Sequence, residues 1–167
     1  NLYSYTAPGH PWVNHEWRAE VAMYGVSHFF GSPGLILFKV ALGGGIIWIL
    51  DRCIRKKVPS LLVRTLTLVW IMAILSPGFN VRPQIFSYLL FAAFLYLFYR
   101  YEEKDQAALY WIPPLTALWV NLHGGFVVGL GALGLFSLLS IFLGGRQGLT
   151  TGRSITRLII PFALSLL

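Results

Sequence analysis

Long apolar stretches separated by short polar segments run through most of the chain. They lie approximately at residues 33–50, 60–76, 83–99, 107–121, 125–143 and 154–167, the last being truncated. A bilayer core about 30 Å thick is crossed by about 20 largely apolar helical residues. The pattern therefore predicts an all-α fold, a polytopic transmembrane helix bundle of about five to six spans.

A polar segment, residues 1–32, precedes the first apolar stretch. Within it Trp17, Val21 and Tyr24 recur at helical spacing, and a Gly-Ser-Pro sequence ends the pattern. This spacing predicts a short helix that lies in the membrane interface. We therefore expect an N-terminal loop with an interfacial helix, followed by the transmembrane bundle over residues 33–167.

The composition supports an integral membrane protein. Hydrophobic residues make up 56% of the chain and charged residues only 11%, against about 25% charged residues in an ordinary soluble domain. The chain begins with Asn and stops inside an apolar run. We therefore expect it to be a piece of a longer protein, incomplete at both ends.

The net charge of +7 is explained by membrane topology. The basic residues do not form the exposed stripe expected of a nucleic-acid-binding surface, so no nucleic-acid partner is predicted. They follow the first, third and fifth apolar stretches, as Arg52, Arg55, Lys56 and Lys57, then Arg100 and Lys104, then Arg146 and Arg153. Basic loops favour the cytoplasmic side, which places residues 1–32, 77–82 and 121–125 together on the extracytoplasmic side.

The strongest candidates for chemistry in the N-terminal segment are Glu16 and His15. Glu16 lies between His15 and Trp17, whereas Glu20, one turn later, is explained by the favourable position of an acid at a helix start. The pair His15 and Glu16 begins like a zinc-protease helix, but that motif needs a histidine at position 19, which is alanine. We therefore expect Glu16 and His15 to take part in acid–base catalysis.

Metal binding is left open by the sequence. His10, His15 and His123 could meet across loops, but their spacing has no ligand signature. Isolated histidines in interfacial loops more often form structural hydrogen bonds than bind a metal. The metal is therefore undetermined, and a divalent cation remains one alternative for the cofactor.

Two further polar segments carry candidate binding residues. Arg82 and Gln84 begin the third apolar stretch, where a guanidinium can hold a phosphate in a two-pronged hydrogen bond or extend to lipid headgroups. Asn121 and His123 lie at the tip of a predicted helical hairpin. Turn geometry alone explains the asparagine, whereas it does not explain the histidine. Because these polar segments lie on the same side of the membrane, we expect Glu16 to face Arg82 and His123 across a cavity.

The tryptophans of these segments have two interpretations. Trp12, Trp17 and Trp119 suit an interfacial aromatic belt, which is the usual role of tryptophan at this depth. They equally suit stacking on a sugar ring. Both interpretations keep the three residues on the extracytoplasmic side.

Three motifs in order resemble those of a bacterial family of polytopic membrane proteins. They are residues 4–17 (SYTAPGHPWVNHEW), 82–87 (RPQIFS) and 119–126 (WVNLHGGF). The chain resembles the GT-C glycosyltransferase superfamily, related to the protein O-mannosyltransferases and to lipid A aminoarabinose transferase. Two positions depart from the pattern, because Asn1 stands where many relatives have Asp and Arg18 where they tend to have Leu.

The resemblance implies a function at the bacterial plasma membrane. It implies transfer of a sugar from a polyprenyl-phosphate donor on the extracytoplasmic face, with a principal acidic base upstream of Asn1. By the same resemblance, Glu16 and His15 assist catalysis. The donor and acceptor would be bound by Arg82, Gln84, Asn121, His123, Trp12 and Trp17. The expected partners are membrane lipids and the lipid-linked sugar.

Two other functions compete with this one. The first is a non-catalytic transmembrane subunit of a larger complex, with other membrane proteins as partners. The second is transport, which predicts ionisable residues at mid-membrane depth in paired broken helices. Apart from Lys39, the ionisable residues lie near the ends of the predicted spans, which argues against transport.

Overall fold

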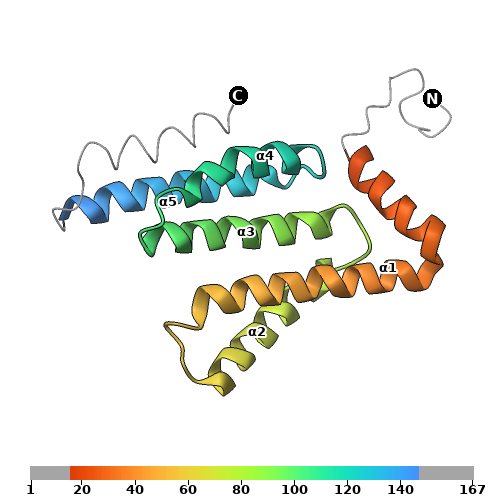
Figure 1. Cartoon of the computed structure of the whole chain (residues 1–167), viewed down its shortest axis with the longest axis horizontal. Coiled ribbons are helices and arrows are strands. Elements are labelled where there is room, and N and C mark those ends of the chain that lie inside the picture. Colours follow the sequence, from red (N-terminus) through yellow and green to blue (C-terminus); the bar gives the residue numbers. More distant parts are fainter. Residues whose placement is uncertain (1–15, 147–167) are drawn as a thin grey trace.

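The computed structural model describes residues 16–146, over which helices are the only regular secondary structure (Figure 1). The helices are α1 (Trp17–Ile54), α2 (Leu61–Leu75), the 3-10 turn η1 (Ser76–Gly78), α3 (Gln84–Glu102), the 3-10 turn η2 (Ala108–Trp111), α4 (Ile112–Val120) and α5 (Phe126–Arg146). The predicted all-α fold is confirmed over these residues. The predicted stretch 154–167 lies outside them.

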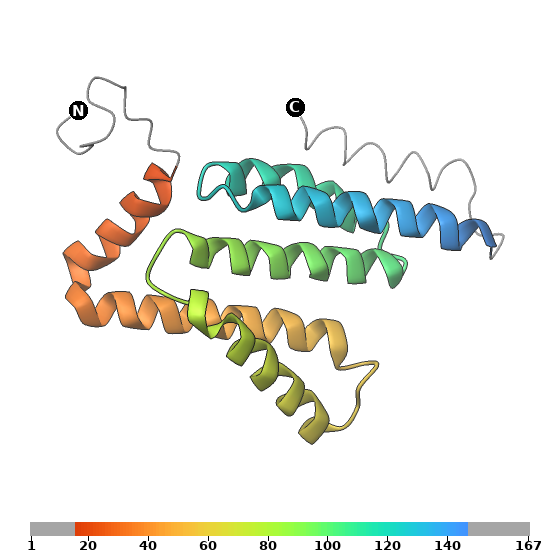
Figure 2. The same ribbon diagram turned by 180° about the vertical axis from the view of Figure 1, so that it is seen from behind.

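Helix α3 occupies the centre of the molecule. Helices α1 and α2 lie on one side of it, and α4 and α5 lie on the other (Figures 1 and 2). The core joins α3 to its neighbours on the second side through Phe94, Ile112, Trp119 and Leu133, all at most 1% exposed. The rings of Phe94 and Trp119 meet edge to face with centroids 5.3 Å apart. This favourable arrangement fixes α4 against the middle of α3.

Helix α1 is two helical parts joined at a sharp break. Gly31 has φ 63° and ψ −162°, a backbone region that is essentially open only to glycine. Pro33 follows two residues later and cannot donate the hydrogen bond that a continuous helix would need. The break therefore lies where the sequence predicts the interfacial helix to end and the first span to begin.

The C-terminus of α3 is closed by a Schellman motif. Lys104 has φ 72° and its N–H donates to the carbonyl of Tyr101 at 3.0 Å, while the N–H of Asp105 donates to the carbonyl of Arg100 at 3.0 Å. These bonds satisfy carbonyls that a helix end leaves without partners. They also turn Asp105 back towards the end of α3, where its carboxylate pairs with Arg100 at 2.5 Å.

Helix α2 is attached mainly to α1. It begins at Ser60, whose hydroxyl caps the N–H of Val63, and Arg64 Nε lies 2.5 Å from Asp51 Oδ1 of α1. The helix has no buried residue. Most of its apolar side chains are therefore exposed, while Ile71 and Leu75 line a pocket against α1 and α3.

Within residues 16–146, two helical segments are long and apolar enough to cross a membrane, Trp17–Ile54 and Leu61–Gly78. This is fewer than the five to six spans predicted, of which the last lies outside the described residues. The segment Ala108–Val120 is too short, since 13 residues rise only about 20 Å. Helix α3 carries Arg100, Glu102 and several tyrosines, which reduce its apolar character.

Candidate functional site

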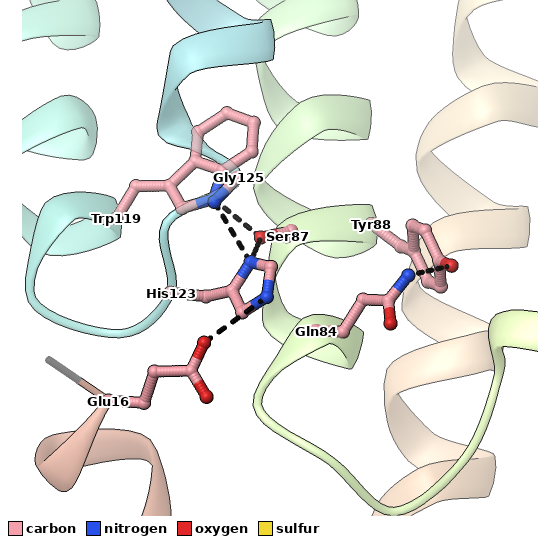
Figure 3. A network of polar contacts seen from close by, with 7 residues as sticks. All are labelled: Glu16, Gln84, Ser87, Tyr88, Trp119, His123 and Gly125. Carbon is pink, nitrogen blue, oxygen red and sulfur yellow. Dashed lines mark hydrogen bonds and ion pairs between the residues drawn. The ribbon is translucent and has the colours of Figure 1, made fainter. Parts of the chain in front are cut away.

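A chain of polar side chains lies where the start of α1, the first turns of α3 and the α4–α5 connection meet (Figure 3). Glu16 Oε1 is 3.3 Å from His123 Nε2. On the other side of the imidazole, Nδ1 is 2.7 Å from Ser87 Oγ. Trp119 Nε1 donates to the same hydroxyl oxygen at 2.7 Å. Four residues that are distant in sequence thus form one connected network, called here the Glu16–Trp119 network.

The α4–α5 connection positions His123. Helix α4 ends at Val120, and the N–H groups of Leu122 and His123 both donate to the carbonyl of Trp119. The side-chain amide of Asn121 donates to the carbonyl of Ala117 at 2.6 Å, which secures the end of the helix. The tight turn that results directs the imidazole towards α3.

The hydrogen bonds determine the tautomer of His123. The backbone N–H of Gly125 donates to Nδ1 at 2.9 Å, so this nitrogen is an acceptor and the ring proton is on Nε2. The Nε2–H then points at Glu16, and the Ser87 hydroxyl donates to Nδ1. The position of the His123 ring proton is thus assigned from its hydrogen-bond partners.

Gly125 leaves no room for a side chain beside the network. A Cβ at this position would lie 2.5 Å from Ser87 Oγ and 2.9 Å from His123 Nδ1. At the preceding Gly124, a Cβ would meet nothing within 4 Å. Glycine at 125 is therefore required by the close approach of the turn to α3, whereas glycine at 124 is not.

An apolar pocket of about 340 Å³ opens beside the network. It is lined by Leu75, Gln84, Ser87, Tyr88, Phe91, Trp119, His123, Gly125 and Val128. A second, almost wholly apolar pocket of about 200 Å³ between α1, α2 and α3 shares Leu75, Tyr88 and Phe91 with it. The two pockets are therefore neighbours, and together they are called here the apolar groove; the polar network borders the first of them.

The structure brings some of the predicted site residues together. Glu16 and His123 are in contact. Gln84 lines the pocket, and its side-chain amide donates to the Tyr88 hydroxyl at 2.7 Å. Arg82 is exposed, and over residues 16–146 its side chain has no ion pair with any carboxylate. The expectation that Glu16 faces Arg82 across a cavity therefore stays a prediction.

The tryptophans divide into three cases. Trp17 is 50% exposed, with the Arg18 guanidinium 5.1 Å from its ring centroid. Trp119 is 1% exposed and bonded to Ser87, so both predicted roles for it, interfacial belt and sugar stacking, are wrong. Trp12 lies outside the described residues, as does His15.

Ser87 is the residue that sequence reasoning missed. It is the last residue of the second motif, one helical turn after Gln84, and it is only 7% exposed. The sequence did offer one indication of its role: Ser87 is a hydroxyl residue in an otherwise apolar helix, three residues after Gln84 and so on the same face. Its partners are 32 and 36 residues away, and no local pattern could have identified them.

The network has the elements of a proton relay. A hydroxyl, an imidazole and a carboxylate are joined in series, an arrangement in which the carboxylate orients the imidazole and the imidazole exchanges protons. Metal binding has less support, because residues 16–146 contain no group of three or more His, Cys, Asp or Glu side chains placed to hold an ion. His10 and His15 lie outside that range.

No family model matches the sequence, and no curated protein or solved structure matches it at a significant level.

Proposed function

We propose that the chain belongs to a membrane glycosyltransferase of the GT-C type, which transfers a sugar from a polyprenyl-phosphate donor at the extracytoplasmic face. One observation carries the proposal: the Glu16–Trp119 network borders the apolar groove. A lipid-linked sugar joins a polar head to a hydrocarbon chain. A site for it needs polar groups beside an apolar channel, which is the combination found here.

Membrane embedding is supported by the apolar surface of α2. Leu66, Trp70 and Ile74 are each more than half exposed. Contiguous apolar surface of this kind is rare on a water-soluble monomer, and lipid chains would cover it. In this proposal the remaining helices also lie in the bilayer as a bundle of about five to six spans.

The proposed orientation follows from the basic residues. The C-terminal ends of α1 and α3, with Arg52, Arg55, Lys56 and Arg100, lie at one end of the molecule, and the α4–α5 connection lies at the other (Figure 2). Basic segments favour the cytoplasmic side. The Glu16–Trp119 network would then face the extracytoplasmic side of a bacterial plasma membrane.

The proposed roles follow the chemistry of glycosyl transfer. The acceptor hydroxyl oxygen attacks the anomeric carbon, the bond from that carbon to the phosphate oxygen breaks, and the hydroxyl proton passes to the acidic base that the resemblance implies, with Glu16 assisting this transfer. His123 orients Glu16 through its Nε2–H. Arg82, two residues before Gln84 at the pocket, stabilises the leaving phosphate, as a guanidinium does in electrostatic catalysis.

The sugar and acceptor would be held by the polar groups around the pocket. Gln84 lies in the pocket wall, and the exposed face of Trp17 suits stacking on a sugar ring. Asn121 contributes through its side-chain carbonyl, since its amide nitrogen is bonded to Ala117. Trp12 and His15, outside the described residues, keep the roles that the resemblance gives them.

The test uses the complete protein in liposomes with a fluorescent polyprenyl-phosphate sugar. We expect Glu16→Gln and Arg82→Ala each to reduce transfer by about 100-fold, the size of an acid–base or electrostatic contribution. The matched controls are Glu20→Gln, one helical turn after Glu16, and Arg55→Ala, which removes an arginine at the opposite end of the molecule. Unchanged transfer in both test variants would refute the proposal.

The alternative is a non-catalytic transmembrane subunit. The outward apolar face of α2 favours it, because a helix with no buried residue could equally pack against a partner helix. Stoichiometric co-purification of a membrane protein, retained in Glu16→Gln and lost when Leu66 and Trp70 are replaced by serine, would support this alternative.

A further inference from the structure

A second pocket, of a different chemical character, lies at the end of the molecule away from the Glu16–Trp119 network. It has a volume of about 330 Å³. It is lined by Arg52, Arg55, Lys56, Tyr96, Tyr99, Arg100, Glu103 and Asp105. These residues come from the C-terminal ends of α1 and α3, which lie side by side in both views (Figures 1 and 2). The set is called here the basic pocket.

Two of its four cations are already neutralised. The Lys56 ammonium is paired with Glu103, and the Arg100 guanidinium lies 2.5 Å from Asp105 Oδ2. These two pairs connect the end of α1 to the end of α3 and shape the pocket. They use both of its acidic side chains.

The other two cations, Arg52 and Arg55, have no carboxylate partner within residues 16–146. The Arg52 guanidinium lies over the ring of Trp48, 4.7 Å from its centroid, in a cation–π contact. Arg55 is three residues further along α1 and so lies on the same side of the helix. Two unpaired guanidinium groups that repel each other therefore share one cavity.

The helix ends reduce this positive charge but do not cancel it. Helices α1 and α3 both end here, and a helix C-terminus carries roughly half a unit of negative charge. Two such ends offset about one of the two unpaired charges. The pocket keeps a net positive field and five-donor guanidinium groups that match the oxygens of a phosphate.

Tyrosine hydroxyls add directed donors. The Tyr96 hydroxyl oxygen accepts a hydrogen bond from Arg100 at 3.3 Å, so its own proton is left to donate to a ligand. Tyr99 lines the same wall. An anion in the pocket would thus meet guanidinium and phenol donors at once.

We propose that the basic pocket binds a phosphate group, carried either by an anionic lipid headgroup or by a soluble phosphorylated molecule. The site is independent of sugar transfer, since it shares no residue with the Glu16–Trp119 network. In the proposed membrane orientation it faces the cytoplasm.

The experiment measures binding to the complete protein in maltoside micelles, which contain no phosphate. Inorganic phosphate and dioctanoyl phosphatidic acid are titrated separately by isothermal calorimetry. The variants are Arg52→Gln and Arg55→Gln. The matched control is Lys104→Gln, which removes the same charge at the same end of the molecule without lining the pocket.

We expect Arg52→Gln and Arg55→Gln each to weaken binding by about tenfold, as loss of one charge-assisted hydrogen bond implies, and Lys104→Gln by less than about twofold. Binding of phosphatidic acid alone identifies a lipid headgroup, and binding of both probes identifies the phosphate itself as sufficient. The proposal is overturned if neither probe binds, if the arginine variants bind like the wild type, or if the control loses as much affinity as they do.

Discussion

Trp119 donates its indole N–H to the hydroxyl of Ser87 at 2.7 Å, in a part of the core where both residues are nearly inaccessible. This bond joins α4 to α3 and holds the hydroxyl that contacts His123. A tryptophan that would otherwise suit the membrane interface therefore acts as an internal support of the polar network.

Trp119→Phe should lower the free energy of unfolding by about 1–3 kcal/mol. The substitution leaves a small cavity and removes the donor to a buried hydroxyl. Trp111→Phe is the matched control, because Trp111 is 64% exposed and its change should stay within about 0.5 kcal/mol. Titration with dodecyl sulfate, followed by circular dichroism, measures both. Equal effects would show that the Ser87 bond contributes nothing to stability.

Gly125→Ala should disturb the network directly, since the new methyl group would lie within 3 Å of both Ser87 Oγ and His123 Nδ1. A loss of about 1–3 kcal/mol is expected for such overpacking, together with a change in the ¹⁵N shift of His123 Nδ1 as its bond to the Gly125 N–H is lost. Gly124→Ala should leave both quantities unchanged. An unperturbed histidine signal in Gly125→Ala would contradict the tautomer assigned above.

Gly31→Ala and Gly25→Ala should change stability in opposite directions. Gly31 has a backbone conformation that alanine adopts at a cost of about 1–3 kcal/mol. Gly25 lies inside the first part of α1 with open space around its Cα, so alanine there should stabilise the helix by up to about 1 kcal/mol. Thermal unfolding in lipid nanodiscs compares the two. A stabilised Gly31→Ala protein would mean that α1 is continuous.

The Lys56–Glu103 pair should persist over a wide pH range. Its hydrogen bond lowers the pKa of Glu103 below 4.5 and raises the pKa of Lys56 above 10.5. The contribution of Glu103 is complete above its unfolded pKa and is lost as the pH falls through the lowered value. That of Lys56 is complete below its unfolded pKa and is lost as the pH rises through the raised value.

Hydrogen exchange of the amides between α1 and α2, corrected for intrinsic rates, measures this range. Exchange should stay slow at pH 5 and rise only below pH 4.5. In Lys56→Gln the rise should begin nearer pH 4.5. A wild-type transition at or above pH 4.5 would show that the pair does not shift the carboxyl pKa.

The helical fold could be predicted because it depends on local patterns. Apolar stretches and breaks at glycine and proline placed α2, α3 and α5 within a few residues of their bounds. The contact between Glu16 and His123 was also expected, from topology. What could not be predicted was the packing partner of each polar group. Ser87 contacts Trp119 only because α4 packs against α3 at one particular position along its axis. The periodicity of the sequence does not specify that position.

The place of Arg82 relative to Glu16 stays a prediction. Its position before a predicted span and its place in a motif suggested a meeting with Glu16. The backbone makes a short local turn there, with the N–H of Arg82 bonded to the carbonyl of Asn80, and the side chain is exposed. The charge pattern could place Arg82 at the end of a span, but it does not specify the direction of the side chain.

Because α1 breaks at Gly31, its first part can rotate about that residue as a rigid helix, with Glu16 at the far end. Helical rise puts Glu16 about 22 Å from the pivot. A rotation of about 10° there would move the carboxylate by about 4 Å, more than the tolerance of any hydrogen bond. The distance between the acid and His123 therefore depends strongly on the angle at a single glycine that is far from both side chains.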